Sequence, residues 1–301
     1  MINFDRQMQV CEQLIGQWHR RTDPNISISI VFPVYNPANG FSEADLAEIK
    51  YMSHTARDMS KKYNLLFMQD GHRQGTILFA HQQLNLLGID ALFSHTIDIS
   101  PAEIELCAQT GTRNVHNPSE IMPIIGRCPV PELLDAGVTV SLGSDGVAPE
   151  RSYDMFRHMF QCMHYHRTYF HDPSYLPAGK VLEMVTIDAA TCPGMQNEIG
   201  SLEVGKKADI ILVDLYKPHL VPLNMAPYRI AHYTNGGDVD SVFINGKILM
   251  EKRRESCVDE GQVLDLAQTL TDRTLARRGL KPLLELPQCF WGHAGFPAQT
   301  K

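Results

Sequence analysis

The 301-residue sequence predicts an α/β protein built on a parallel sheet. Strand-like and helix-like segments alternate up to Thr191, and such alternation is typical of parallel strands joined by right-handed helical crossovers. Polar side chains directly follow several of the apolar runs, which is where parallel sheets collect functional groups. After Thr191 the pattern changes to short strands and an Asn-Gly turn, which predicts a smaller β unit.

The segments before residue 90 carry clear boundary signals. A helix is predicted over 4–20, where apolar residues recur at four-residue spacing, and a β-branched strand over 26–32 ends at a proline. A helix over 42–62 opens with serine and an acidic first turn. An apolar strand over 65–68 and a helix over 76–87 complete this part.

The same alternation continues through the next fifty residues. A strand is predicted over 91–94, and Pro101 occupies the first position of the helix that follows. A strand over 112–115 and a short helix over 131–136 lead to a strand over 138–142. That last run is too short for a helix, and its β-branched and aliphatic residues suit a strand buried in a parallel sheet.

Asp145 stands in a Gly-Ser-Asp-Gly turn directly after the last of these strands. Flanking glycine residues let other groups approach the carboxylate, so the position indicates chemistry. The alternative is that Asp145 caps a helix predicted over 151–166.

Several other strand ends also carry polar residues. A single histidine at such a place is more often structural, but three histidines together with Asp145 favour a metal site or an acid/base site. The residues that follow the apolar runs are Gln69, Asp70, His72, His95, His116, Asn117 and Asp145.

The composition excludes several classes of protein. The net charge of −7 and the lack of a Lys/Arg block argue against a nucleic-acid partner. The sequence has no run of about 18 apolar residues, so no membrane span is predicted, and its first residues lack a secretory signal. Seven scattered cysteines without a Cys-x-x-Cys spacing predict reduced thiols, a cytoplasmic protein and no cysteine zinc site.

Four motifs together resemble the amidohydrolase superfamily. They are His95 after its strand, His116-Asn-Pro, the run from Ala136 to Asp145, and Gly200-Ser-Leu-Glu-Val-Gly-Lys-Lys-Ala-Asp. The most similar branch holds cytosine-deaminase-like, adenosylhomocysteine-deaminase-like and triazine-chlorohydrolase-like enzymes. The resemblance implies part of a (β/α)8 TIM barrel with a small C-terminal β-sandwich portion. We therefore expect a hydrolase barrel over 1–198, the sandwich part over 199–256, and a helix with an irregular tail over 257–301.

The resemblance also implies roles for the strand-end residues. Asp145 matches a metal ligand that takes a proton from the attacking water, and His95 matches a histidine that polarises the attacked group or orients the water. One divalent metal is implied, zinc first and iron as an alternative, with His72 as its second ligand or Asp70 in place of His72. The implied substrate is a small nitrogen heterocycle, and its contacts are expected at His116, Asn117 and Glu120.

The sequence departs from the family pattern in two places. The family's first barrel strand ends in a His-x-His pair, and nothing of that form precedes Ile26. His164-Tyr-His166 lies in a predicted helix, where the two side chains point to different faces. No glutamate follows His72 as a proton shuttle. About three opening strands are expected to be absent, and exposed sheet edges then predict a homo-oligomer.

Three hypotheses follow from these patterns. The first is a metal-dependent hydrolase that deaminates or dechlorinates a nitrogen heterocycle through hydroxide. The second is a catalytically inactive homologue with a binding or regulatory role. The third is a different α/β protein such as a phosphate-binding barrel, although Glu150 and Asp154 after Asp145 would repel an anion.

Overall fold

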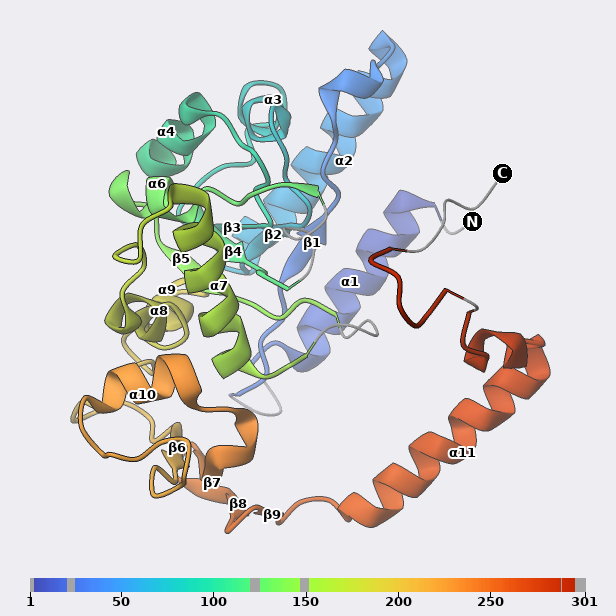
Figure 1. Cartoon of the computed structure of the whole chain (residues 1–301). Helices are drawn as coiled ribbons and strands as arrows, with labels where there is room; N and C mark the ends of the chain where they lie inside the picture. Colours follow the sequence, from blue (N-terminus) through green and yellow to red (C-terminus); the bar gives the residue numbers. More distant parts are fainter. Residues whose placement is uncertain (1–2, 21–24, 120–124, 147–151, 288, 296–301) are drawn as a thin grey trace.

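The protein is built around a five-stranded parallel sheet (Figure 1). The computed structural model describes residues 3–20, 25–119, 125–146, 152–287 and 289–295. The strands lie in chain order, each paired in parallel with the next. They are β1 (Ile30–Phe32), β2 (Phe67–Gln69), β3 (Ala91–Ser94), β4 (Arg113–His116) and β5 (Val140–Leu142). The predicted α/β class with a parallel sheet is confirmed.

Helices fill the connections between these strands, as the sequence predicts. Ser42 caps its helix in a capping box, because its hydroxyl accepts from the Asp45 N–H while the Asp45 carboxylate accepts from the Ser42 N–H. Pro101 occupies the first position of α4. The elements up to β5 are α1 (Phe4–Trp18), η1 (Pro37–Asn39), α2 (Glu43–Lys62), α3 (Thr76–Gln82), α4 (Pro101–Thr110) and α6 (Val130–Asp135).

Several predicted elements are shorter in the structure, and two of them differ most. Only Ile30–Phe32 of the strand expected over 26–32 pairs with β2. The helix expected over 76–87 ends at Gln82, because Asn85 adopts a left-handed conformation and the Leu86 N–H turns back to the Ala80 carbonyl. Such a reversal satisfies the last carbonyls of a helix and ends it.

The helix after Asp145 begins later than predicted. It is α7 (Met155–Phe170), and Asp154 caps it by accepting from the Phe156 N–H at 3.0 Å. The alternative in which Asp145 is the helix cap is therefore wrong. The next two helices are α8 (Ala178–Met184) and α9 (Ile187–Thr191).

The sheet is buried between these helices. The side chains of Phe67 and Phe93 have no exposed surface, and β3 and β5 are buried along their whole length. One core cluster packs α6, α7 and α8 around β3 and β5, and a second packs α1 and α2 around β1 and β2. Burial on both faces is thus complete at β3 and β5, whereas Val31 of β1 is exposed and alternate residues of β2 and β4 are only partly buried.

A buried carboxylate joins two helices of this layer. Glu103 on α4 is fully buried, and its Oε1 accepts from the backbone N–H groups of Ile77 and Leu78 at the start of α3. Its Oε2 accepts from the N–H and hydroxyl of Ser100 at the start of α4. One side chain thus satisfies donors at the amino ends of both helices, where a negative charge is stabilised.

The C-terminal strands form a separate antiparallel sheet in the order β6-β7-β8-β9. Asn245 and Gly246, with φ values of 49° and 78°, make the predicted two-residue hairpin turn. Within the described residues these strands form one sheet, so the expected sandwich is not confirmed. The elements are β6 (Ile210–Val213), α10 (Ala226–Tyr233), η2 (Gly236–Asp238), β7 (Val239–Ile244), β8 (Lys247–Glu251), β9 (Arg254–Glu255), α11 (Glu260–Arg278) and η3 (Lys281–Leu284).

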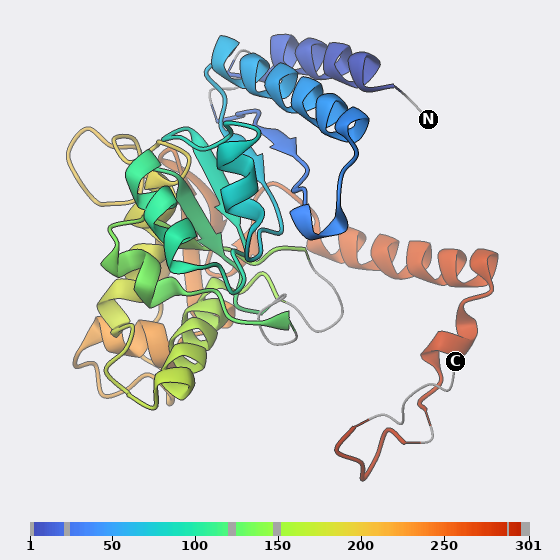
Figure 2. The ribbon, with the colours of Figure 1, turned by 90° about the horizontal axis from the view of Figure 1, so that it is seen from above.

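The last helix, α11, projects away from the two sheets (Figures 1 and 2). Along it Leu266 and Leu270 are exposed, and none of its residues is buried. In the part of the chain that the structure describes, no helix is long and apolar enough to cross a membrane.

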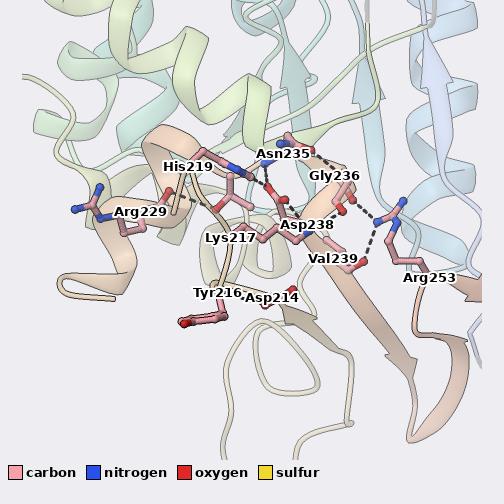
Figure 3. A network of polar contacts seen from close by, with 12 residues as sticks. Asp214, Tyr216, Lys217, His219, Arg229, Asn235, Gly236, Asp238, Val239 and Arg253 are labelled. Carbon is pink, nitrogen blue, oxygen red and sulfur yellow. Dashed lines mark hydrogen bonds and ion pairs between the residues drawn. The ribbon is translucent and has the colours of Figure 1, made fainter. Parts of the chain in front are cut away.

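Asp238 is the centre of a polar network at the start of β7 (Figure 3). Its carboxylate accepts from Lys217 Nζ at 2.9 Å, from His219 Nε2 at 3.0 Å and from the Asn235 N–H at 2.9 Å. Burial opposes ionisation of this carboxyl, but the hydrogen bonds from His219 and Lys217 outweigh burial and lower its pKa to about 2. The network links the segment before α10 to β7.

Replacing Glu103 by alanine should lower the free energy of unfolding by about 2–4 kcal/mol, because four donors lose one buried acceptor. Urea denaturation would measure the change. Glu105→Ala, at an exposed position of the same helix, is the matched control and should change stability by less than about 0.5 kcal/mol. Equal effects of the two substitutions would contradict the bridging role of Glu103.

The contribution of Asp238 should depend on pH. Its folded pKa lies below the unfolded value of 3.8, so its stabilisation is present above about pH 4 and is lost as pH falls toward 2. Asp238→Asn should therefore cost about 2 kcal/mol at pH 7 and roughly half of that at pH 3. Urea titrations of both proteins at pH 7, 5, 4 and 3 would test this, and a difference independent of pH would disprove it.

Candidate functional site

Backbone hydrogen bonds continue the parallel ladder past the ends of three strands. The His95 N–H donates to the Val115 carbonyl at 3.1 Å, and the Gly143 N–H donates to the His116 carbonyl at 2.9 Å. The His72 N–H bonds to the Ser94 carbonyl at 3.3 Å. The loops that carry the predicted site residues are therefore anchored to one edge of the sheet.

Three of the predicted residues meet at this edge. His95 Nε2 lies 3.2 Å from Asp70 Oδ1 and 3.3 Å from Asp145 Oδ2. The His95 ring is buried, whereas the carboxylates of Asp70 and Asp145 reach solvent. A hydrogen bond from His95 lowers the pKa of Asp70, partly against burial, and the Ser94 hydroxyl also donates to this carboxylate.

The backbone is unusual at two of these three positions. His95 has φ of 65° and Asp145 has φ of 59°, which is the left-handed region that few non-glycine residues adopt. The Asp145 carboxylate also accepts from the Gly146 N–H. Such conformations cost free energy and gather at functional sites, so they support a role for this edge.

His72 lies deeper, with its ring centroid 4.1 Å from that of Phe93 and the two rings tilted by 32°. Its Nδ1 is 2.9 Å from Thr76 Oγ1, and the Thr76 hydroxyl donates its proton to the Arg73 carbonyl. Nδ1 must therefore carry the ring proton, which leaves a lone pair on Nε2. Nε2 is buried without a hydrogen-bond partner among the described residues, and burial lowers the pKa of His72 to about 3.

These donors fit a divalent metal ion in their chemistry. A neutral imidazole with a free lone pair and two carboxylates are ligand types that zinc and iron accept. The orphaned Nε2 of His72 is the observation that favours a cation nearby. The ligand atoms of His72, Asp70 and Asp145 do not all lie within 4.8 Å of one another in the described structure.

The predicted substrate contacts are spread over β4 and the loop after it. His116 is buried with its ring 5.7 Å from that of His166 on α7. Asn117 is buried beside Gly143, where an added Cβ would lie 2.3 Å from Asn117 Oδ1. Glu120 lies outside the described residues.

Sequence reasoning did not find Ser94. It is the last residue of β3, it is buried, and its hydroxyl donates to Asp70. The available signal was a polar residue at the end of a fully apolar strand, next to His95.

Comparison with known protein families gives a match over most of the chain. The profile of the amidohydrolase family matches residues 38–249. A 5'-deoxyadenosine deaminase of Methanosarcina acetivorans is 32% identical over 251 residues, which are 75% of this chain and 58% of that protein. A 5-methylthioadenosine/S-adenosylhomocysteine deaminase of Syntrophobacter fumaroxidans is 36% identical over 64% of this chain and 45% of its own length. The chain thus spans about half the length of these relatives.

Solved structures share the fold. A zinc-bound adenosine deaminase from Xanthomonas campestris superposes with a TM-score of 0.77 at 24% identity, covering 89% of this chain and 62% of that one. A zinc complex of atrazine chlorohydrolase from Arthrobacter aurescens gives 0.76 at 22% identity, covering 89% and 60%. The resemblance inferred from the sequence motifs is confirmed, and the parallel sheet corresponds to part of an amidohydrolase TIM barrel.

Gly143→Ala should lower the free energy of unfolding by about 1–3 kcal/mol, because the new methyl group would overlap Asn117 Oδ1 and lie 2.8 Å from Val115 Cγ1. Gly146→Ala, three residues further on, has no atom within 4 Å of the added carbon and is the control. Thermal and urea unfolding of both variants would decide the matter. A Gly143→Ala protein as stable as the control would show that Asn117 is not held as the structure describes.

Proposed function

Because the chain belongs to the amidohydrolase family, we propose that it hydrolyses a C–N bond other than a peptide bond, and that the reaction is deamination of an adenine-type nucleoside. The observation that carries the proposal is the meeting of Asp70, His95 and Asp145 at the carboxyl edge of the sheet. The names of two relatives, a 5'-deoxyadenosine deaminase and a 5-methylthioadenosine/S-adenosylhomocysteine deaminase, support the substrate class.

The proposed chemistry assigns a proton path to this edge. Asp145, partly exposed, accepts a proton from the attacking water and later returns it to the departing ammonia. His95, held between two carboxylates, polarises the group that is attacked or orients the water. One divalent ion, zinc or iron, would supply Lewis acidity that lowers the pKa of water from about 15.7 to about 7.

The ion would be held by Asp145 and His72, with Asp70 as the alternative to His72. His72 offers a neutral imidazole with its lone pair on Nε2, and Asp70 offers a more exposed carboxylate. His116, Asn117 and Glu120 are proposed to contact the heterocycle. Because Gly143 has no side chain, the Asn117 side chain lies close to the strand end and can contact the heterocycle there.

Ammonia release from 5'-deoxyadenosine, 5'-methylthioadenosine and S-adenosylhomocysteine tests the proposal directly, with the purified chain supplied with zinc or iron(II). We expect turnover, and a loss of roughly 10²–10⁴-fold in kcat/KM for Asp145→Asn, the size of a lost general acid/base. His164→Ala, at an exposed position of α7, is the control and should keep the wild-type rate. A folded chain that binds these nucleosides but releases no ammonia would support the inactive homologue instead, and release of chloride from a chlorinated triazine would indicate dechlorination.

Metal content separates the two ligand alternatives. If His72 is the ligand, His72→Asn should lose the ion while Asp70→Asn keeps it, because only an unprotonated imidazole or a carboxylate can bind there. The reverse result would assign Asp70. Elemental analysis after dialysis, with circular dichroism to verify folding, gives the number of metal equivalents per chain, and the wild-type number in both variants and in Asp145→Asn would reject this site.

A further inference from the structure

A second group of ligand-type side chains lies between β4 and α7. It consists of His116, Cys162 and His166, and one ligand atom from each lies within 4.8 Å of the others. All three side chains are buried, with at most 1% of His116 exposed. Cys162 and His166 are four residues apart on α7, so both project from the same side of that helix.

Both ring nitrogens of His166 face backbone carbonyl oxygens, so a neutral ring makes only one of the two contacts as a hydrogen bond. Nδ1 lies 2.8 Å from the Cys162 carbonyl and Nε2 lies 3.0 Å from the Cys128 carbonyl. Carbonyl oxygens only accept, and a neutral imidazole carries one N–H. One ring nitrogen therefore directs its lone pair at an oxygen, unless the ring is charged inside an apolar layer, which is costly.

His116 adds a second unsatisfied atom to the same place. Its Nε2 is buried and has no hydrogen-bond partner among the described residues. An unpaired buried polar atom of this kind costs about 1–3 kcal/mol. Beside a buried thiol there are thus one histidine with an unpartnered ring nitrogen and one with both ring nitrogens facing carbonyl oxygens, an arrangement that the described residues do not complete.

We propose that His116, Cys162 and His166 form a binding site for a divalent ion with affinity for nitrogen and sulfur, zinc above all, distinct from the edge that holds Asp145. In this site His116 would bind the ion instead of the heterocycle. Binding would use the imidazole lone pairs and a Cys162 thiolate, whose proton passes to solvent as the metal–sulfur bond forms. The ring nitrogen of His166 that does not bind would donate to a carbonyl, which is how metal-binding histidines are commonly oriented.

Zinc binding requires the His166 nitrogen that binds to turn away from the carbonyl oxygen it now faces, and it requires the ligand atoms to move closer together. Ligands of a tetrahedral zinc ion lie about 3.3–3.8 Å apart, given bond lengths near 2.0–2.3 Å. The three atoms here span up to 4.8 Å, so side chains must close by about 1 Å. Because the ligands come from β4 and from α7, a bound ion would join the sheet to the helix that follows Asp145.

Cobalt(II) spectroscopy tests the proposal, because only a thiolate ligand produces a near-ultraviolet sulfur-to-cobalt band. The experiment uses the full chain with the three cysteines that are not buried, Cys11, Cys257 and Cys289, changed to serine, freed of metal and titrated with cobalt(II). We expect one equivalent to produce the band and zinc to abolish it by displacement. Absence of the band in the folded protein would overturn the proposal.

Variants locate the ligands. Cys162→Ser should remove the band, and His166→Asn should weaken binding by more than about 100-fold, beyond the effect of groups that only orient a ligand. Cys107→Ser, at another buried thiol, and His164→Ala, on the exposed side of α7, are matched controls that should retain the band. A full-strength band in Cys162→Ser would refute the assignment.

Folding is measured separately, so a failed variant does not decide the outcome. Zinc should raise the unfolding temperature of the serine-substituted parent and of His164→Ala by more than that of a folded Cys162→Ser, which retains only the proposed site at Asp145. If Cys162→Ser does not fold, the band of the parent and the His166→Asn titration still test the site. Ammonia release does not enter these readouts, so this site and the proposed deaminase activity can fail independently.

Discussion

Parallel strand pairing is the constraint on which the rest of this structure depends. Because every strand from β1 to β5 runs in the same direction, all carboxyl ends lie along one edge, and the loops after them must meet there. Backbone bonds from His72, His95 and Gly143 extend the ladder into those loops. Side chains distant in sequence, such as Asp70 and Asp145, therefore reach the same imidazole.

Some buried polar side chains are fully hydrogen-bonded within the fold, whereas others retain an unpaired atom. Glu103 satisfies four donors and joins two helices, so it is fully used by the fold. His72 and His116 each retain a buried nitrogen that has no hydrogen-bond partner in the part of the chain that the structure describes. Both nitrogens lie at or beyond strand ends, where a ligand would complete them.

Prediction from the sequence succeeded where a local pattern has one physical explanation. Serine with an acidic residue three positions later begins α2, and Asn245-Gly246 makes a hairpin turn. It failed at the start of α7, where Asp154 is the cap, because several Asp and Ser residues nearby offer the same local signal. The meeting of His116 with α7 was also missed, since cysteine spacing along the chain reveals nothing about contacts between a strand and a helix.

The sequence by itself determined the alternation of strands and helices, the residues that follow each strand, and membership in a family recognisable from four short motifs. Only the tertiary structure decided which of those residues meet. His95 contacts Asp70 and Asp145, while His72 turns inward onto Phe93. The reason is that a loop side chain takes its direction from backbone angles and packing partners set by neighbouring strands, and these are properties of the folded sheet rather than of any local run of residues.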